Sequence, residues 1–378
     1  MKVLIIPDKF KGTLTASAAV AAIARGWRRS RPRDVIDLLP MSDGGDGFGE
    51  VMGKILRAKI QKVQTMDAAH RACEALWWWD AKTKTAVIES ANVIGLAKLP
   101  AGEFHPFALD TFGLGAVIRA AAGKGARRCV IGIGGSATND GGFGLARALG
   151  WSFWDDDDVA IEQWTGLHRL ARISAPRRTR WFCELIVAVD VQNPLLGIRG
   201  ATRVYGAQKG LRAGDFAAAE KCLRHFARKS GGEGKLSRNA ASQPGAGAAG
   251  GLGFGLMTFL GAKPVSGFEL FAEWARLDEH LREADLVITG EGQLDESSFM
   301  GKGVGELVRR CRVKKIPCLA LSGDLDARAG LKKFFVAAHA LSELTTVAKA
   351  KADPAGWLEQ LAERSAKLKS LNSLRRGQ

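Results

Sequence analysis

The stretch of this chain that is richest in groups able to do chemistry runs from position 131 to 142 and reads IGIGGSATNDGG. An apolar, strand-like run leads into a loop of successive glycines, hydroxyl groups, an amide and an acid. Successive backbone N–H groups in such a loop can form a concave anion-binding site. The residues predicted to bind an anionic ligand there are Gly134, Gly135, Ser136, Thr138, Asn139 and Asp140.

Two further loops combine acids with glycines. Asp43 lies in SDGGDG at 42–47, and Asp295 lies in TGEGQLDESSFMGKG at 289–303. Carboxylate oxygens are the ligands that Mg²⁺ prefers, so the two acids of the first loop could hold this ion, and the composition of the second suits Mg²⁺ together with phosphates. A plain turn explains 42–47 equally well. The binding candidates beside them are Gly44, Gly45, Gly290 and Glu291.

A lysine-containing loop, PDKFKGTLT at 7–15, joins a predicted strand to a predicted helix. The N-terminus of a helix can hold an anion, so Lys11, Gly12 and Thr13 are binding candidates. Taken alone, however, a capped helix start explains this loop better than a phosphate site does. The spacing of the common phosphate-binding loop, G-x-x-x-x-G-K-[ST], is absent.

Three charged residues and one amide complete the set. Asp190 follows an apolar strand, where a carboxylate can act as a base or a metal ligand, although an Asn-Pro turn would also suit this position. Asn193 and Lys209 lie just beyond it, and Lys302 lies between glycines in the 289–303 segment.

One motif suggests a different chemistry. Gly132, Gly134 and Ala137 fit the G-x-G-x-x-G/A fingerprint of dinucleotide binding, and Asp155 follows about 20 residues later. An NAD(P)-dependent oxidoreductase that uses this loop is therefore the alternative. The extra Asn139-Asp140 pair, just where the helix of that motif should begin, argues against it.

The sequence lacks the residue patterns that several other reaction classes require. No histidine stands near a serine or cysteine in a nucleophile setting, and no G-x-S-x-G elbow occurs, which argues against acyl transfer. The six cysteines form no C-x-x-C pair, and no zinc-ligand spacing is present. They are expected to be free thiols in a reducing compartment.

Short apolar runs rich in β-branched residues alternate with helix-length segments at both ends of the chain, which predicts parallel sheets covered by helices. We predict an α/β protein with two domains. A discontinuous, Rossmann-like domain is expected from 1–60 and 284–378, with a second α/β domain, 61–283, inserted into it. The predicted active site lies in the cleft between the domains.

Composition supports an ordinary globular protein. Of 378 residues, 46% are hydrophobic and 25% are charged, which excludes a disordered chain. No apolar run reaches the length of a membrane span, so a cytoplasmic location is expected. The 55 basic residues exceed the 39 acidic ones and give a net charge of +16. Nucleic acid is one candidate partner, but basic residues do not alternate with aromatic ones, so solvated helix faces explain the charge better.

Together the loops resemble the type I glycerate kinase family, whose members phosphorylate glycerate with ATP. The matching motifs, in order, are PDKFKG (7–12), DGG (43–45), IGIGGSATNDGG (131–142), DVQNPLLG (190–197), QKG (208–210), PGAGAAGGLG (244–253) and ITGEGQLD (288–295). The chain departs from the family pattern at Lys9, Asp46 and Ala207, where Ser, Glu and Pro are usual.

The resemblance implies two α/β domains, ATP and Mg²⁺ as requirements, and phosphoglycerate, most simply 2-phosphoglycerate, as the product. On this basis Asp190 is expected to accept the proton of the attacking hydroxyl, with Asp295 as the alternative. Lys11 and Lys302 would neutralise charge on the transferring group. Asp43 and Asp295 would hold Mg²⁺, and the remaining candidates would bind substrate or nucleotide. The partners expected are small molecules rather than nucleic acid or membrane, and a homo-oligomer is left open.

Overall fold

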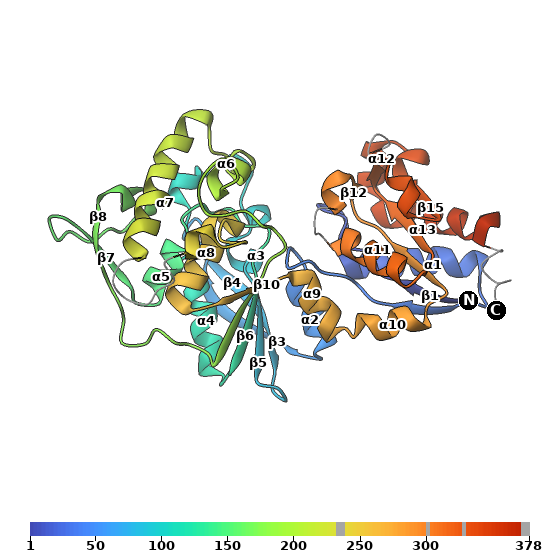
Figure 1. Cartoon of the computed structure of the whole chain (residues 1–378), viewed down its shortest axis with the longest axis horizontal. Helices are drawn as coiled ribbons and strands as arrows, with labels where there is room; N and C mark the ends of the chain where they lie inside the picture. Colours follow the sequence, from blue (N-terminus) through green and yellow to red (C-terminus); the bar gives the residue numbers. More distant parts are fainter. Residues whose placement is uncertain (232–238, 300–302, 327–329, 372–378) are drawn as a thin grey trace. The chain divides into compact units, whose positions relative to one another are not determined.

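The computed structural model describes residues 1–231, 239–299, 303–326 and 330–371 (Figure 1). The chain divides into two compact units. Unit 1 comprises Met1–Asp43 and Phe268–Gln378, and unit 2 comprises Gly44–Gly267. Each unit has its own mainly parallel sheet with helices packed against it. The predicted class, α/β with a discontinuous first unit and an inserted second one, is confirmed.

Unit 1 is built on five parallel strands in the order β15-β13-β11-β1-β2. Their bounds are β1 Lys2–Ile5, β2 Val35–Leu38, β11 Leu286–Thr289, β13 Cys318–Ser322 and β15 Ala337–Ala340. A short parallel pair, β12 Gln293–Leu294 and β14 Asp324–Leu325, follows β11 and β13 in the chain. The helices are α1 Ala16–Ser30, α9 Gly267–Trp274, α10 Leu277–Glu283, α11 Gly303–Val313, α12 Val347–Ala352 and α13 Pro354–Ala366.

Helix α1 illustrates how the sequence determines the start and the buried face of a helix in this unit. The Thr15 side chain caps its first turn, and Ile23 and Trp27 are buried on its apolar face. Gly26 lets α1 pack closely on α13, because a Cβ at this position would lie 2.0 Å from the backbone oxygen of Glu359. The helical spacing predicted from the sequence thus corresponds to the buried face.

Unit 2 is built on six strands in the order β10-β9-β6-β5-β4-β3. The parallel strands are β5 Thr85–Glu89, β6 Arg128–Gly132, β9 Glu184–Ala188 and β10 Lys263–Val265, and β3 Lys59–Met66 and β4 Ala72–Asp80 form an antiparallel edge. A separate hairpin consists of β7 Ser152–Asp155 and β8 Leu170–Ser174. The helices are α2 Phe48–Ile55, α3 Ala91–Ile94, α4 Leu114–Gly123, α5 Phe143–Ala148, α6 Ala201–Tyr205, α7 Phe216–Ser230 and α8 Ala248–Leu260.

The unit boundaries lie earlier in the chain than the predicted domain boundaries at 60/61 and 283/284. Unit 1 gives way to unit 2 after Asp43 and resumes at Phe268. Helix α2 belongs to unit 2 because its glycines pack on the β4 tryptophan Trp78, and Cβ atoms at Gly49 and Gly53 would lie 1.9 and 2.2 Å from its ring. This contact also gives the Trp77–Trp79 run a packing role.

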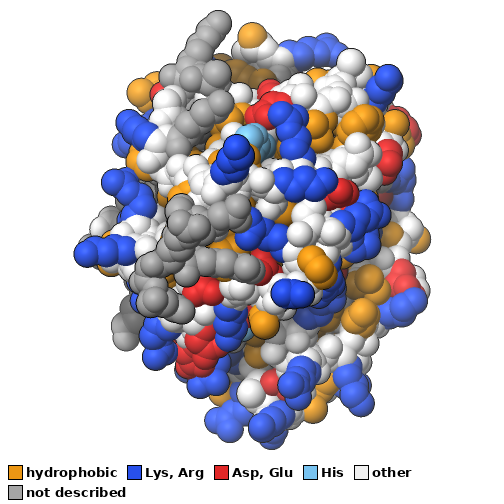
Figure 2. Space-filling model, turned by 90° about the vertical axis from the view of Figure 1, so that its right-hand side faces the viewer, with side chains coloured by type: hydrophobic (Ala, Val, Ile, Leu, Met, Phe, Trp, Pro, Cys, Tyr) orange, Lys and Arg blue, Asp and Glu red, His pale blue; other side chains and the backbone are white. Residues whose placement is uncertain are grey.

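Among the residues that the structure describes, no helix combines the length and hydropathy needed to cross a membrane. Lys and Arg side chains are spread over the face of the molecule shown in Figure 2 rather than gathered in one place. On that face the distribution fits the solvated surfaces expected from the sequence.

Candidate active site

The predicted site residues follow the carboxyl ends of parallel strands, the edge at which α/β proteins bind ligands. In unit 1 they follow β1, β2 and β11, and in unit 2 they follow β6 and β9. Each group is described within its own unit.

Unit 1 gathers three carboxylates, Asp8, Asp43 and Glu291, which we call the acidic cluster. The Lys9 ammonium lies 3.2 Å from Asp43 Oδ1 and 3.8 Å from Asp8 Oδ1. Burial, followed by the nearby Asp43 and Glu291 carboxylates, raises the pKa of Asp8 to about 7 against the opposing charge of Lys9. Three neighbouring carboxylates are the kind of oxygen-rich setting in which a cation or a Mg²⁺–phosphate group can bind.

Asp8 was not among the predicted site residues. It is 8% exposed and lies just beyond β1, where its N–H donates to Gly290 O at 2.8 Å. That hydrogen bond fixes the 7–15 loop beside the loop that follows β11. Asp8 is part of the PDKFKG motif at 7–12, but the motif alone does not show that its carboxylate joins those of Asp43 and Glu291.

The remaining predicted residues of unit 1 have different surroundings. Gly12 has φ +76°, and the Thr13 hydroxyl donates to Phe10 O at 2.9 Å, so both shape a turn. Gly290 permits close packing, because a Cβ there would lie 1.7 Å from Leu321 O. Lys11 is exposed in the same turn, and its backbone N lies 3.0 Å from the Cβ position of Gly292.

Asp295 begins a short 3-10 helix, Glu296–Phe299, and its backbone N–H donates to the Ser298 hydroxyl at 3.2 Å. Lys302 lies outside the described residues. Within the described ranges, no three His, Cys, Asp or Glu side chains form a complete metal site. Mg²⁺ commonly takes only one or two protein carboxylates together with phosphate oxygens, so the acidic cluster still fits this ion.

In unit 2, the predicted glycines bring two loops into contact. A Cβ at Gly134 would lie 2.4 Å from Gly45 Cα, and one at Gly135 would lie 1.8 Å from Asp46 Oδ1. Gly44 has φ +91°, and a Cβ there would lie 2.8 Å from the carbonyl oxygen of Ala188. These glycines thus allow the 44–47 loop to rest on the ends of β6 and β9.

A buried carboxylate that was not predicted secures the same loop. Glu89, the last residue of β5, accepts hydrogen bonds from the backbone N–H groups of Gly47 and Gly49, each at 2.9 Å. It therefore caps α2 with both oxygens. No motif spacing could reveal this contact, because it joins residues 40 or more positions apart.

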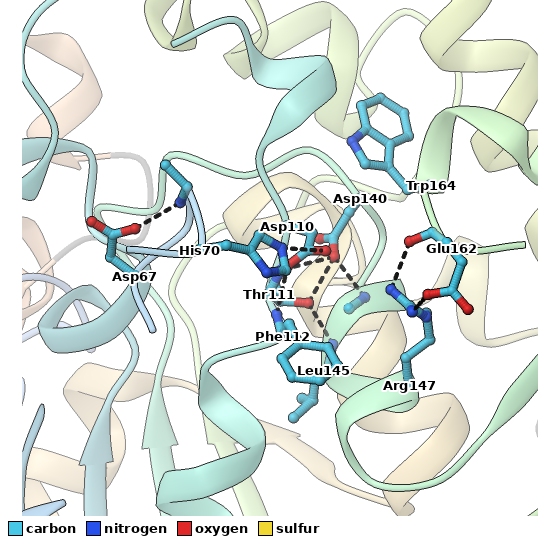
Figure 3. A network of polar contacts seen from close by, with 12 residues as sticks. Asp67, His70, Asp110, Thr111, Phe112, Asp140, Leu145, Arg147, Glu162 and Trp164 are labelled. Atoms are coloured by element: carbon cyan, nitrogen blue, oxygen red, sulfur yellow. Dashed lines mark hydrogen bonds and ion pairs between the residues drawn. The ribbon is translucent and has the colours of Figure 1, made fainter. Parts of the chain in front are cut away.

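Asp140 anchors the 134–142 loop from within the protein. Figure 3 shows its carboxylate against Thr111 and the start of α5, with Asp110 and His70 alongside. One oxygen accepts from the Thr111 hydroxyl at 2.7 Å and from the Gly144 N–H at 2.9 Å. Burial and the neighbouring Asp110 raise the pKa of Asp140 to about 6. The carboxylate thus joins the 134–142 loop to Thr111 and to the first turn of α5 through hydrogen bonds.

Asn139 and Lys209 hold the same loop. The Asn139 amide donates to the Thr202 hydroxyl at 3.1 Å. The buried Lys209 ammonium donates to Ser136 Oγ at 3.1 Å and to Thr138 O at 2.6 Å. Within the described parts of the chain, the backbone N–H groups of Ser136, Thr138 and Asn139 have no acceptor. These donors give the loop the character of an anion site.

Asp190 lies two residues beyond β9, and its Oδ1 accepts a hydrogen bond from Ser266 Oγ at 2.7 Å, just after β10. Asn193 uses both ends of its amide within the protein, since it donates to Arg199 O and accepts from the Tyr205 hydroxyl, each at 2.7 Å. Asp190 is thus oriented at the sheet edge, whereas Asn193 shapes the following loop.

The dinucleotide alternative is not supported. The fingerprint requires a helix that begins within the glycine motif, but α5 begins only at Phe143. Asp155 is buried in the β7–β8 hairpin, where its carboxylate accepts from the N–H groups of Asp157 and Val159 and pairs with Arg169. It is a turn residue.

Comparisons with known proteins agree with this geometry. Residues 3–370 match the model of the glycerate kinase family. The chain is 38% identical over 328 residues to a glycerate kinase of Halalkalibacterium halodurans, with 85% of each chain covered. It is 36% identical over 339 residues to the glycerate 2-kinase of Escherichia coli K12, covering 88% of this chain and 87% of that protein.

A crystal structure from Salmonella typhimurium LT2, described as glycerate kinase 2, superposes with a TM-score of 0.81 at 31% identity and covers 100% of this chain and 99% of that one. Sequence and fold therefore lead to the same result: this chain is a kinase that belongs to the glycerate kinase family.

Proposed function

We propose that this enzyme transfers the γ-phosphoryl group of ATP to a hydroxyl of glycerate with the help of Mg²⁺, and that the product is 2-phosphoglycerate. The observation that carries the proposal is the acidic cluster of unit 1 in a chain of the glycerate kinase family. The proposal includes small-molecule substrates and a cytoplasmic location.

The acidic cluster supports a role in handling Mg²⁺ and the nucleotide phosphates. Carboxylates packed this closely would repel a bare triphosphate but would stabilise one that carries a divalent cation. Asp8 and Asp43 are the proposed ligands within the cluster, and Asp295 is a further candidate from the loop after β12. When bound, Mg²⁺ would neutralise charge on the phosphate oxygens.

Asp190 is the proposed general base of unit 2. The acceptor hydroxyl must lose its proton as its oxygen forms a bond to the γ-phosphorus and the bond from that phosphorus to ADP breaks. A carboxylate held by Ser266 at the edge of the sheet is oriented to take that proton. Lys11 and Lys302 are proposed to neutralise the charge of the transferring group.

The test is an ADP-release assay with ATP, Mg²⁺ and D-glycerate, run on the wild type, Asp190→Asn and a matched control, Asp156→Asn. Asp156 is an exposed acid in the β7–β8 turn. Removing a general base should lower kcat by about 10²–10⁴-fold, and the control should be unchanged. Near-normal kcat in Asp190→Asn would contradict the base assignment. Failure of the wild type to phosphorylate any small hydroxy acid would overturn the proposed function.

A further inference from the structure

Lys209 is unusual because its charge is buried beneath a loop rather than displayed to solvent. It ends the 3-10 helix Ala207–Lys209 and is 7% exposed. Its ammonium donates to two atoms of the 134–142 loop, Ser136 Oγ and Thr138 O. Burying an ammonium is costly even when hydrogen bonds offset part of the lost hydration, so this position calls for an explanation beyond packing.

The hydrogen bond to Thr138 O sets the direction of a peptide plane. The described peptide bonds are trans, and in a trans peptide the C=O and the following N–H point in opposite directions. Because the Thr138 carbonyl points at Lys209, the N–H of Asn139 points away from it. Gly135 O accepts from Leu96 N–H at 2.8 Å, so the N–H of Ser136 is directed away from Leu96 in the same manner.

Both N–H groups, those of Ser136 and Asn139, are among those of this loop that lack an acceptor within the described parts of the chain. Because the carbonyls of Gly135 and Thr138 are held by the protein, the N–H groups that follow them are preorganised to bind the oxygens of a carboxylate or phosphoryl group. The charge of Lys209 beneath the loop adds to its positive potential.

We propose that Lys209 is a positioning residue. It orients the 134–142 loop to bind an anionic group of the substrates, and it does so without touching the ligand. This inference rests on the proposed function, because the anion it prepares for is the carboxylate of glycerate or a phosphate of the nucleotide. It differs from the expectation that Lys209 itself binds substrate.

The charge of Lys209 supplies a signature that a purely structural residue would lack. Burial lowers the pKa of Lys209 to about 7, while Asp140, the charged group that acts on it, opposes the shift. The ammonium therefore loses its proton as pH rises through neutrality. An arginine at this position would stay charged throughout this range.

The experiment measures the Kd of D-glycerate and of Mg²⁺–ADP separately by calorimetry, from pH 6 to 9, in the wild type, Lys209→Met and Lys209→Arg. Lys221→Met is the matched control, because Lys221 is exposed on α7. We expect Lys209→Met to weaken one of the two ligands at least tenfold at pH 6 and to leave the other within twofold. The affected ligand identifies the anion.

In the wild type, affinity for that ligand should fall as pH rises through about 7, whereas Lys209→Arg should show no such fall. Ser136→Ala, which removes one of the two acceptors, should give a smaller loss and serves as the test if Lys209→Met does not fold. The inference would be overturned if Lys209→Met bound both ligands as tightly as the wild type does. If Lys209→Met does not fold, the same result in Ser136→Ala would overturn it. So would a fall with pH that persists in Lys209→Arg.

The assay of glycerate phosphorylation by the wild type is independent of these outcomes. If the wild type does not phosphorylate glycerate but the variants still lose affinity for an anion, the proposed function fails while the positioning role of Lys209 stands. If phosphorylation is confirmed and Lys209→Met binds normally, only the positioning role fails.

Discussion

At the scale of single residues, Asp8 is an acid of unit 1 whose pKa lies far from its ordinary value. Its pKa is raised from 3.8 to about 7, mainly by burial and next by Asp43. The protonated form contributes stability that is fully present below the ordinary pKa and is lost as pH rises to about 7. Three pKa units correspond to at most about 4 kcal/mol.

Asp8→Asn should therefore be more stable than the wild type at pH 8 in the absence of divalent cations, because the substitution removes a buried negative charge. The difference should shrink as pH falls toward 4, where the wild-type carboxyl is protonated. Denaturant unfolding at several pH values measures this, with Asp156→Asn as the control. A variant less stable than the wild type at pH 8 would refute the electrostatic account of the cluster.

A substitution at Gly135 tests whether the glycines of the 134–142 loop are needed for its close packing on the 44–47 loop. Its φ is +70°, and an added Cβ would lie 1.8 Å from Asp46 Oδ1. Gly135→Ala should lower the free energy of unfolding by about 1–3 kcal/mol and reduce activity, because the 44–47 loop must move. Gly123→Ala is the control, since nothing lies within 4 Å of its Cβ position at the end of α4. Unchanged stability in Gly135→Ala would argue against the packing role.

Single residues also show which features of the site could be predicted from the sequence and which could not. The rule that polar loops follow strands correctly predicted that Asp43, Asp190 and the 134–142 loop come after the carboxyl ends of β2, β9 and β6. The sequence could not separate side chains that face a ligand from those that hold a loop. Asp140 and Asn193 have suitable chemistry, yet their polar atoms bind the protein.

At the scale of elements, helix α2 depends on a carboxylate from the neighbouring strand. Glu89→Gln replaces one of two accepting oxygens with an amide that cannot accept, so the N–H of Gly47 or Gly49 loses its partner. The expected loss is about 1–3 kcal/mol, with weaker substrate binding because the 44–47 loop loosens.

Thermal unfolding and KM measurements check this prediction. Glu74→Gln is the matched control, because Glu74 is exposed and forms an ion pair with Lys62 on the surface. Such exposed pairs contribute little to stability. Equal effects of the two substitutions would show that the cap of α2 is not required.

The elements themselves were largely predictable, because apolar runs and helical periodicity are local. Domain boundaries were not, because they depend on which sheet a helix packs against. Helix α2 follows β2 in the chain but packs on Trp78 of β4 in unit 2, which shifts the boundary to Asp43. Only the tertiary contact of Gly49 and Gly53 with that ring reveals it.

At the scale of the whole molecule, the net charge of +16 should act through long-range attraction of anionic substrates. Screening extends over about 10 Å at 0.1 M salt, so kcat/KM should fall by a few fold between low salt and roughly 0.5 M KCl. Stopped assays in KCl, with sucrose as a control for viscosity, measure this. A kcat/KM that does not change with ionic strength would remove any such role for the charge.

The measurement that tests the central claim most directly is ³¹P NMR of the wild-type enzyme with ATP, Mg²⁺ and D-glycerate. The account predicts that ATP resonances give way to ADP and to one equivalent of a phosphomonoester with the shift of 2-phosphoglycerate, and that EDTA stops the conversion. A 3-phosphoglycerate resonance would correct the product alone. ATP that remains intact in the presence of glycerate would contradict the account.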